Sequence, residues 1–242
     1  MEIYKKRTEE EMGVCAADLG AQAILQAIKK NGSARIILAT GASQFAMLEQ
    51  LVKKEIPWNH VEMYHLDEYC DLPITHKASF RKYLKERFID IVHPAKIHLI
   101  DGEGDVESHI LNLTGSIRSR PIDVAFIGIG ENGHIAFNDP PADFETHAAY
   151  IVVNLDQDCK NQQVSEGWFP SIKEVPDKAI SMTVHQILEA KKIICTVPGA
   201  RKAKAIQATL MSKNNDPMIP ASALWNHADC ALVLDEESAA LI

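Results

Sequence analysis

The sequence predicts an α/β protein with a doubly wound, mostly parallel sheet flanked by helices, Rossmann-like and forming a single domain over residues 1–242. Short apolar runs alternate with helical patterns from end to end, which is typical of parallel strands joined by crossover helices. The chain has 242 residues, 46% of them hydrophobic, which is enough for one well-buried core. No linker, repeat or low-complexity tract divides it.

The first helix has a clear start and a clear stop. Thr8-Glu9-Glu10-Glu11 is a capping box, in which a hydroxyl and a carboxylate satisfy free N–H groups at a helix start. Asn31-Gly32 is a stop signal. The inner side of this helix is expected to carry Met12, Leu19, Ala23 and Leu25 or Ile28.

The remaining elements are read from apolar runs and their periodicity. Strands are expected at 36–39, 61–66, 97–100, 122–129, 150–155, 179–182, 192–197 and 231–234. Helices are expected after 40–43, where Phe45, Leu48 and Val52 share a face, and at 79–91, 105–118, 184–190 and 200–211.

The overall charge disfavours several classes of partner. The net charge of −8 does not suit a polyanion, so we expect no nucleic acid. We see no secretory signal and no apolar run of membrane-spanning length, so no membrane partner is expected. The five scattered cysteines fit a reducing cytoplasm. The ten histidines show no metal-ligand spacing, so no metal or cofactor is predicted.

The most informative stretch is GIGENGHIAFNDP, residues 128–140, which directly follows the apolar run at 122–129. Its glycines let the backbone bend tightly at the strand end. His134 lies in that bend, with Asp139 five residues later. The carboxyl ends of parallel strands are where α/β proteins place their sites, and histidine titrates near neutrality. A lone histidine in a surface loop is the plainer interpretation, and a second acidic motif argues against it.

That second motif is Asp67-Glu68, where the strand at 61–66 ends. Adjacent side chains of an extended chain point in opposite directions, so only one carboxylate can readily face a crevice. A solvated loop acid is the commoner fate of such a pair. The alternative is a general base that moves a carbon-bound proton.

Two turns offer seats for an anion. Thr40-Gly41-Ala42-Ser43 supplies N–H groups and two hydroxyls at a helix start, although Ser43 as an ordinary helix cap is also open. Gly199-Ala200-Arg201-Lys202 repeats the arrangement with two cations, which oppose the helix dipole and suggest a bound anion. All four features follow strands, so we expect one crevice suited to proton transfer on a phosphorylated small molecule.

These motifs resemble the glucosamine-6-phosphate deaminase (isomerase) family. The resemblance rests on Leu66-Asp67-Glu68-Tyr69 and on residues 128–140, with the two turns resembling that family's phosphate-binding elements. The related 6-phosphogluconolactonases share the opening of the second motif, but Ala136-Phe137-Asn138-Asp139-Pro140 sides with the deaminases.

The resemblance implies a metal-free conversion of an amino sugar phosphate and water to a ketose phosphate and ammonia. His134 would open the sugar ring, Asp139 would orient and charge His134, and Asp67 would carry the C2 proton to C1. The expected catalytic set is Asp67, His134, Asp139 and Asn132. The expected substrate-binding set is Thr40, Gly41, Ala42, Ser43, Glu68, Gly133, Arg201 and Lys202.

The chain departs from the family pattern in three places. Asn132 stands where some members carry an acid, which removes a charge that would raise the pKa of the histidine. Gly167 stands where the family has an arginine that clamps the phosphate, so we expect Arg201 to supply the second cation or the substrate to differ. The segment after Pro140 lacks the basic cluster of allosteric members; Ala149 and Ile151 are small or apolar.

We consider three candidate functions for this protein. The first is an amino sugar phosphate deaminase that acts on glucosamine 6-phosphate. The second is a 6-phosphogluconolactonase-type ester hydrolase, which needs no C2 proton transfer. The third is a sugar-phosphate sensor without catalysis, against which the Asp67, His134 and Asp139 set argues because a sensor needs no proton-transfer pair. The sugar epimer is left open, and so is a homo-oligomer.

Overall fold

A seven-stranded parallel sheet forms the centre of the molecule in the computed structural model, which describes residues 1–212 and 215–242. Its strand order is β1-β10-β9-β6-β2-β3-β5, and every neighbouring pair is parallel. This confirms the predicted fold class. The strands are β1 (Glu2–Lys5), β2 (Ala34–Leu38), β3 (Val61–His65), β5 (Lys96–His98), β6 (Val124–Ile127), β9 (Lys192–Val197) and β10 (Cys230–Leu234).

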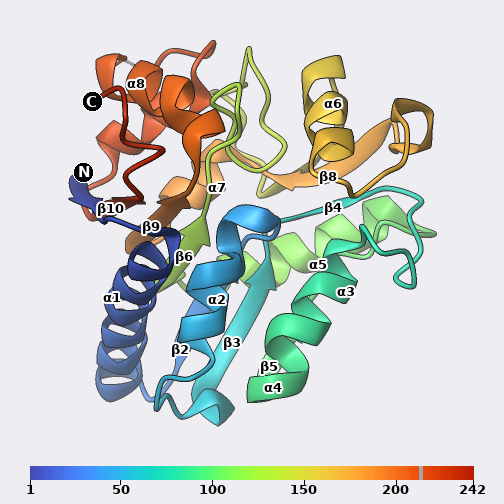
Figure 1. Ribbon diagram of the computed structural model, residues 1–242. Coiled ribbons are helices and arrows are strands. Elements are labelled where there is room, and N and C mark those ends of the chain that lie inside the picture. Colours follow the sequence, from blue (N-terminus) through green and yellow to red (C-terminus); the bar gives the residue numbers. More distant parts are fainter. Residues whose placement is uncertain (213–214) are drawn as a thin grey trace.

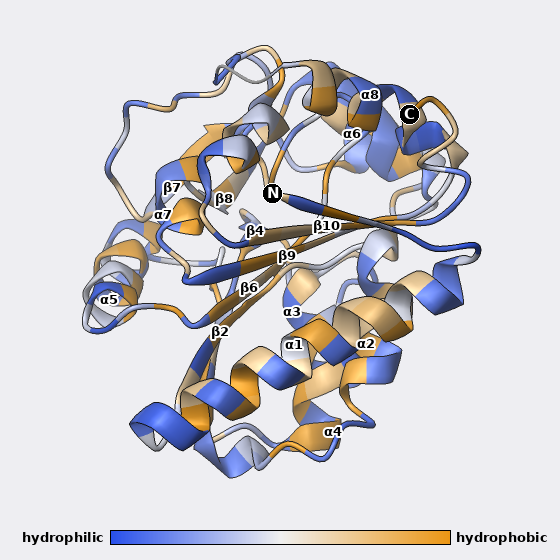
Figure 2. Cartoon of the chain, turned by 90° about the vertical axis from the view of Figure 1, so that its left-hand side faces the viewer, coloured by the Kyte–Doolittle hydropathy of each residue, from blue (hydrophilic) through white to orange (hydrophobic). Residues whose placement is uncertain are grey.

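Helices cover both faces of this sheet, which makes it doubly wound (Figures 1 and 2). One face packs against α1 (Glu9–Asn31), α2 (Phe45–Leu51) and α3 (Phe80–Leu84) through a core that includes Met47 and Phe126. The other face packs against α5 (Val106–Arg118), α7 (Val184–Leu188) and α8 (Ala203–Met211). The central strands are buried on both faces and are mostly apolar, which is why the sequence shows them as apolar runs.

The direction of winding reverses between β2 and β6. The chain runs outward from β2 through β3 to β5, then returns through α5 to place β6 on the opposite side of β2. The loops that leave neighbouring strands at such a point diverge and open a crevice at the carboxyl edge of the sheet. Residues 39–43 and 128–134 are those loops, so the topology brings the two motifs together.

Two strands that the sequence analysis assigned to an alternating α/β pattern belong to a separate antiparallel sheet. This sheet has the order β4-β8-β7 and contains β4 (Asp67–Tyr69), β7 (Tyr150–Asn154) and β8 (Lys178–Met182). The short β4 was not predicted, because three residues carry little periodic signal. It begins directly after β3, so Asp67 is paired opposite Ser181 at the joint between the two sheets.

The inner side of α1 differs from the expected one. Met12 is buried as expected, but Leu25 is exposed at 41%, and Leu19, Ala23 and Ile28 are only partly buried. The buried positions are mainly small: Met12, Gly13, Ala16, Ala17, Gly20, Ala21, Ile24 and Ala27. A Cβ on Gly20 would lie 2.4 Å from the Phe126 ring, so close approach to the sheet selects small residues. Apart from Met12 and Ile24, the large apolar side chains of α1 therefore lie beside the contact and not in it.

The predicted ends of α1 are correct, since Thr8 accepts from the Glu11 N–H and Gly32 closes the helix with φ of 77°. Several strands are shorter than expected, notably β6 and β5. The helical region after Ser79 is continuous but contains a π turn, Lys85–Ile89, before α4 (Asp90–Val92). Besides β4, the sequence prediction also missed β1, which carries charged residues, and α6 (Gln157–Ser165), which has no strong amphipathic pattern.

Candidate functional site

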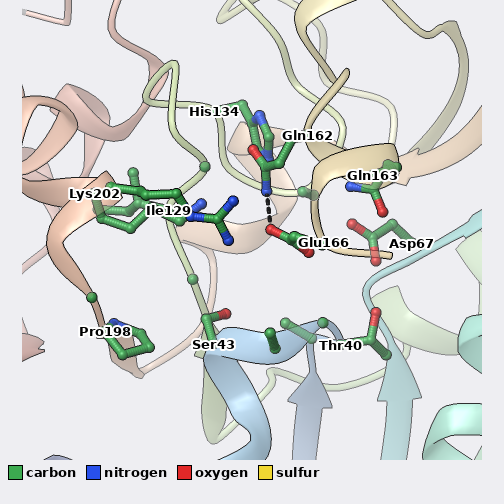
Figure 3. Close-up of a pocket in the computed structure, with 18 of the residues that line it drawn as sticks. Thr40, Ser43, Asp67, Ile129, His134, Gln162, Gln163, Glu166, Pro198 and Lys202 are labelled. Atoms are coloured by element: carbon green, nitrogen blue, oxygen red, sulfur yellow. Dashed lines mark hydrogen bonds between the residues drawn. The ribbon is translucent and has the colours of Figure 1, made fainter. Parts of the chain in front are cut away.

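A cavity of about 410 Å³ opens at the carboxyl edge of the parallel sheet (Figure 3). Its wall comes from the segments that follow β2, β3, β6 and β9, together with residues of α6. Thr40, Gly41, Ala42, Ser43, Asp67, His134, Arg201 and Lys202 all line it. The structure therefore brings most of the sequence-predicted site residues together in one place.

Two glycines make this convergence possible. A Cβ on Gly128 would lie 2.8 Å from the Ser43 Oγ atom, and a Cβ on Gly130 would lie 2.1 Å from the His134 ring. Both gaps are too small for a methyl group. The glycines of the motif are thus required less for a sharp bend than for close packing of the Ser43 turn and of the histidine ring.

The turn at residues 40–43 is held from below by Gln44, which the sequence analysis did not single out. Gln44 is fully buried, and its Nε2 donates to Ser43 Oγ at 3.1 Å, to Ile127 O at 3.2 Å and to Thr196 Oγ1 at 2.9 Å. These contacts fix the turn to β6 and β9. Ser43 does not cap a helix with its side chain, which excludes the ordinary-cap interpretation.

His134 and Asp139 form an acid–base pair. His134 Nδ1 lies 3.1 Å from Asp139 Oδ1, and Asn132 Nδ2 donates to the same oxygen at 3.1 Å. Asn132 Oδ1 also accepts from the His134 backbone N–H at 3.1 Å. Burial raises the pKa of Asp139, but the hydrogen bonds from His134, Asn132 and Cys159 outweigh it, so this pKa is below its ordinary value. Asp139 is therefore a fixed carboxylate that orients the ring.

Asn138 locks the loop that carries this pair. Its Nδ2 donates to Ile135 O at 2.7 Å and to Met182 O at 2.9 Å, which attaches the loop to β8. Gly133 does not line the cavity; it adopts a φ of +86° and packs against Ile219. Its role in the structure is to form the turn before His134, so the expected direct substrate contact is not what the structure shows.

Asp67 is 7% exposed and reaches the cavity, and its carboxylate makes no hydrogen bond or ion pair with any residue in 1–212 or 215–242. Burial, and secondarily the charge of Glu68, raises the pKa of Asp67 to about 8. A carboxylate in this state is a much stronger base than an exposed one once it is ionised. The arrangement suits removal of a weakly acidic proton.

Glu68 points away from the cavity, which overturns its expected role as a substrate-binding residue. It is fully buried and accepts from Ser79 Oγ at 3.0 Å and from the Arg81 N–H at 2.7 Å. The Phe80 N–H adds a third contact at 3.2 Å. Glu68 thus binds the start of α3, as the opposed directions of neighbouring strand residues require.

Lys202 and Arg201 differ sharply in their surroundings. Lys202 is 8% exposed and, in the described chain, forms no hydrogen bond or ion pair, so its ammonium is directed into the cavity. Burial lowers its pKa, while the charges of Glu166 and Glu131 oppose that change. The Arg201 side chain is 57% exposed, with Nε 3.4 Å from Glu131 Oε1 and Nη1 3.2 Å from Ser165 Oγ.

The second turn is a poorer anion seat than the sequence suggested. The Gly199 N–H donates to Asp235 Oδ2 at 2.8 Å, and the Ala200 N–H donates to Glu237 Oε2 at 3.3 Å. Carboxylates of the C-terminal segment therefore already occupy two of its backbone donors. The group of this segment that remains to attract an anion is chiefly the Lys202 side chain, which lines the cavity.

Three cavity residues come from α6, an element absent from the sequence prediction: Gln162, Gln163 and Glu166. The only sequence signal near them was Gly167, which stands where the family has an arginine that clamps the phosphate. That glycine has a φ of +80° and ends the helix, which turns the neighbouring Glu166 into the cavity wall. Among the described residues, no three His, Cys, Asp or Glu side chains converge as a metal ion would require.

The fold and the site together define an α/β protein with an acid–base pair and a serine-bearing turn in one cavity at the carboxyl edge of its sheet. The chain belongs to the glucosamine-6-phosphate isomerase/6-phosphogluconolactonase family, whose model matches residues 7–233. This membership agrees with the resemblance inferred from the motifs.

Relatives that match this chain over most of their length are named as deaminases. A glucosamine-6-phosphate deaminase of Halothermothrix orenii is 36% identical over 250 residues and 100% of both chains, and one of Clostridium botulinum is 33% identical over 93% of this chain and 92% of that protein. A solved monomeric glucosamine-6-phosphate deaminase matches with a TM-score of 0.91 at 30% identity over both full chains. A 6-phosphogluconolactonase structure from Shewanella baltica matches with a TM-score of 0.79 at 18% identity over 97% of both chains, a likeness of fold alone.

Proposed function

We propose that this protein converts glucosamine 6-phosphate and water to fructose 6-phosphate and ammonia. The observation that carries the proposal is the joint presence, in one cavity, of the buried base Asp67, the His134–Asp139 pair and the unpaired ammonium of Lys202. The deaminase names of relatives that match over their full length support the same reaction.

We assign ring opening to His134. Its Nδ1 faces Asp139, so Nε2 is the atom left to act on substrate. It takes the proton of the C1 hydroxyl and returns a proton to the ring oxygen as the C1–ring oxygen bond breaks. Asp139 stabilises the imidazolium formed between the two transfers.

Isomerisation falls to Asp67. The ionised carboxylate removes the proton at C2, and the electron pair forms a C1–C2 double bond. The C1 carbonyl bond opens at the same time, and its oxygen takes up a proton released by the C2 ammonium group, which gives an enolamine. The same carboxyl then returns the proton to C1, and the nitrogen forms a C2 imine. Addition of water at C2 and loss of ammonia complete the reaction. A base held in a dry site makes proton removal from carbon feasible.

Phosphate binding falls to the turn at 40–43 and to Lys202. Ser43 Oγ and the backbone N–H groups of the turn offer neutral donors, and Lys202 offers the charge. We propose Arg201 as a second cation in place of the arginine absent at Gly167. Binding energy from this remote group helps to hold C2 against Asp67.

The decisive experiment measures ammonia and fructose 6-phosphate released from glucosamine 6-phosphate by the purified protein. Equal formation of both products is expected. The same preparation is assayed for hydrolysis of 6-phosphogluconolactone. Lactone hydrolysis without ammonia release would identify the hydrolase, and binding of the sugar phosphate without turnover would identify a sensor.

We further propose that the protein acts in the cytoplasm and as a monomer. All five cysteines are free, and four of them are buried, which suits a reducing compartment. A solved relative described as monomeric supports the second point. None of the described helices is long and apolar enough to cross a membrane. Light scattering of the purified protein tests the monomer, and fractionation of the source cells tests the compartment.

A further inference from the structure

One wall of the cavity carries a carboxylate for which the proposed reaction has no use. Glu166 lies at the end of α6 and lines the cavity together with Gln162 and Gln163 (Figure 3). Neither ring opening nor proton transfer at C2 needs it. An acid beside Lys202 also weakens the attraction for a phosphate, so its presence calls for a compensating role.

The carboxylate is fixed in place from behind. Gln162 Nε2 donates to Glu166 Oε1 at 2.8 Å, and Trp168 Nε1 donates to Glu166 Oε2 at 3.1 Å. The Trp168 ring packs against Phe45 of α2 with centroids 6.4 Å apart, which ties this corner to the turn at 40–43. Each carboxylate oxygen accepts more than one hydrogen bond, so one donor on each leaves acceptor capacity for a ligand in the cavity.

Glu166 also occupies a middle position along the cavity. Figure 3 shows it between Lys202 on one side and Asp67 on the other. Its charge acts on the ammonium of Lys202, and that same ammonium is the phosphate partner in the proposed function. Glu166 therefore faces the part of a bound molecule that joins the reacting carbon to the phosphate.

A hexosamine 6-phosphate places a specific group there. With C2 at Asp67 and C6 directed toward Lys202 by its phosphate, the carbon midway between C2 and C6 is C4, which carries a hydroxyl. We propose that Glu166 accepts a hydrogen bond from the C4 hydroxyl and thereby sets the choice between gluco and galacto configurations. This inference rests on the proposed function for the placement of the two ends of the substrate.

The energetic argument favours such a contact as a source of specificity. A hydrogen bond to a charged group contributes roughly 1.5–3 kcal/mol, about a 10- to 100-fold difference in affinity. The wrong epimer loses this bond and also leaves a desolvated carboxylate with unfilled acceptor capacity. Weaker phosphate attraction is the cost of that discrimination.

The test compares Glu166→Gln with the wild type in binding of non-reacting sugar phosphates. The ligands are the 2-amino-2-deoxyhexitol 6-phosphates of gluco and galacto configuration and the 4-deoxy form, measured by calorimetry. The amide keeps the shape of Glu166 but carries no charge, so a hydrogen bond that it accepts from a hydroxyl is weaker than one to the carboxylate. We expect the wild type to discriminate between the epimers about 10- to 100-fold, and the variant to bind all three within a few-fold.

Glu131→Gln is the matched control. Glu131 carries the same charge near Lys202 and Arg201 but does not line the cavity. Both variants should bind inorganic phosphate more tightly than the wild type, since each loses an acid beside the cations. Only Glu166→Gln should lose epimer discrimination.

Three outcomes would overturn the proposal: an unchanged epimer ratio in Glu166→Gln, an equal change in Glu131→Gln, or no binding of any hexitol phosphate by the wild type. If Glu166→Gln unfolds, Glu166→Asp replaces it; the shortened acid should weaken binding of the preferred epimer more than that of the 4-deoxy ligand. Because these ligands do not react, the binding result stands apart from the deaminase assay. If the wild type releases no ammonia but still discriminates between the epimers, the deaminase reaction is rejected and the contact between Glu166 and the C4 hydroxyl is retained.

Discussion

His134 Nδ1 and Asp139 Oδ1 lie 3.1 Å apart, and the Asn132 amide donates to the same carboxylate oxygen. Two donors on one oxygen fix both the plane of the carboxylate and the direction of the ring. Asn132 thus takes part in the pair as a neutral partner, and its amide also accepts from the backbone of His134. An aspartate at position 132 would place two carboxylates side by side, which would raise the pKa of one of them.

Replacing Asp67 tests its role as the base. Asp67→Asn keeps the shape of the side chain but cannot accept the C2 proton, so turnover should fall by about 10²–10⁴ with substrate still bound. In the wild type, kcat/KM should rise with pH up to about 8, because burial raises the pKa of Asp67 to about that value. Steady-state kinetics across pH measure both, and near-normal turnover in the variant would exclude Asp67 as the base.

The same residue makes stability depend on pH. Its pKa is about 8 in the folded protein and 3.8 in an unfolded chain, so between these values the folded state holds a proton that the unfolded state has released. Stability should therefore fall as pH rises, with a slope of up to about 1.4 kcal/mol per pH unit from this group. Asp67→Asn removes that contribution and should be the more stable protein at about pH 8. Urea unfolding across pH measures the slope, with Asp158→Asn, an exposed site, as the control.

Ring opening and proton transfer can be separated at His134. His134→Gln should slow reaction from the closed pyranose more than exchange of the C2 proton in an open-chain substrate, because only the first step needs the imidazole. Asp139→Asn should weaken turnover more mildly and shift the pH–rate profile, since it alters the orientation and charge of the ring. Equal losses in both assays for His134→Gln would contradict the assignment, as would an unshifted profile for Asp139→Asn.

Arg201 has two possible roles, and kinetics distinguish them. If it leaves Glu131 to bind the phosphate, Arg201→Ala should raise KM by roughly 10- to 100-fold, the effect of losing a charge-assisted hydrogen bond of about 1.5–3 kcal/mol. If its pairing with Glu131 persists, KM stays unchanged. The second result would assign phosphate binding to Lys202 and the turn at 40–43.

Gly128 offers a test of the proposal that the turn at 40–43 holds the phosphate. In Gly128→Ala the new methyl group would lie 2.8 Å from Ser43 Oγ, so the serine must move away. KM for the sugar phosphate should rise, with a smaller change in kcat, because the catalytic pair is elsewhere in the cavity. Gly115→Ala in α5 is the control, since nothing lies within 4 Å of its Cβ position. Similar kinetics for both variants would show that the turn does not position the phosphate.

The sequence was most informative where local chemistry determines local structure. The capping box at Thr8 and the stop at Gly32 correctly gave the ends of α1. The apolar runs located the strands of the parallel sheet except β1, because residues buried on both faces leave an uninterrupted apolar signal. The opposed directions of Asp67 and Glu68 also followed from the pleat of an extended chain.

Tertiary contacts decided the rest. The sequence could not separate β7 and β8 from the main sheet, because strand pairing depends on residues far apart in the chain. It could not show that Glu68 binds the start of α3, or that Asp235 and Glu237 cover the N–H groups of Gly199 and Ala200. In each case the partner lies at a sequence separation that no local pattern spans.

By itself the sequence therefore determined the alternating architecture and the residue types at the strand ends, since periodicity and glycine content are local properties. Only the tertiary structure decided which of those residues meet. The change of winding direction between β2 and β6 assembles the cavity, and the end of α6 at Gly167 brings Glu166 into its wall. Both features depend on how distant segments pack against one another. That packing is selected by the free energy of the whole chain, and no single segment determines it.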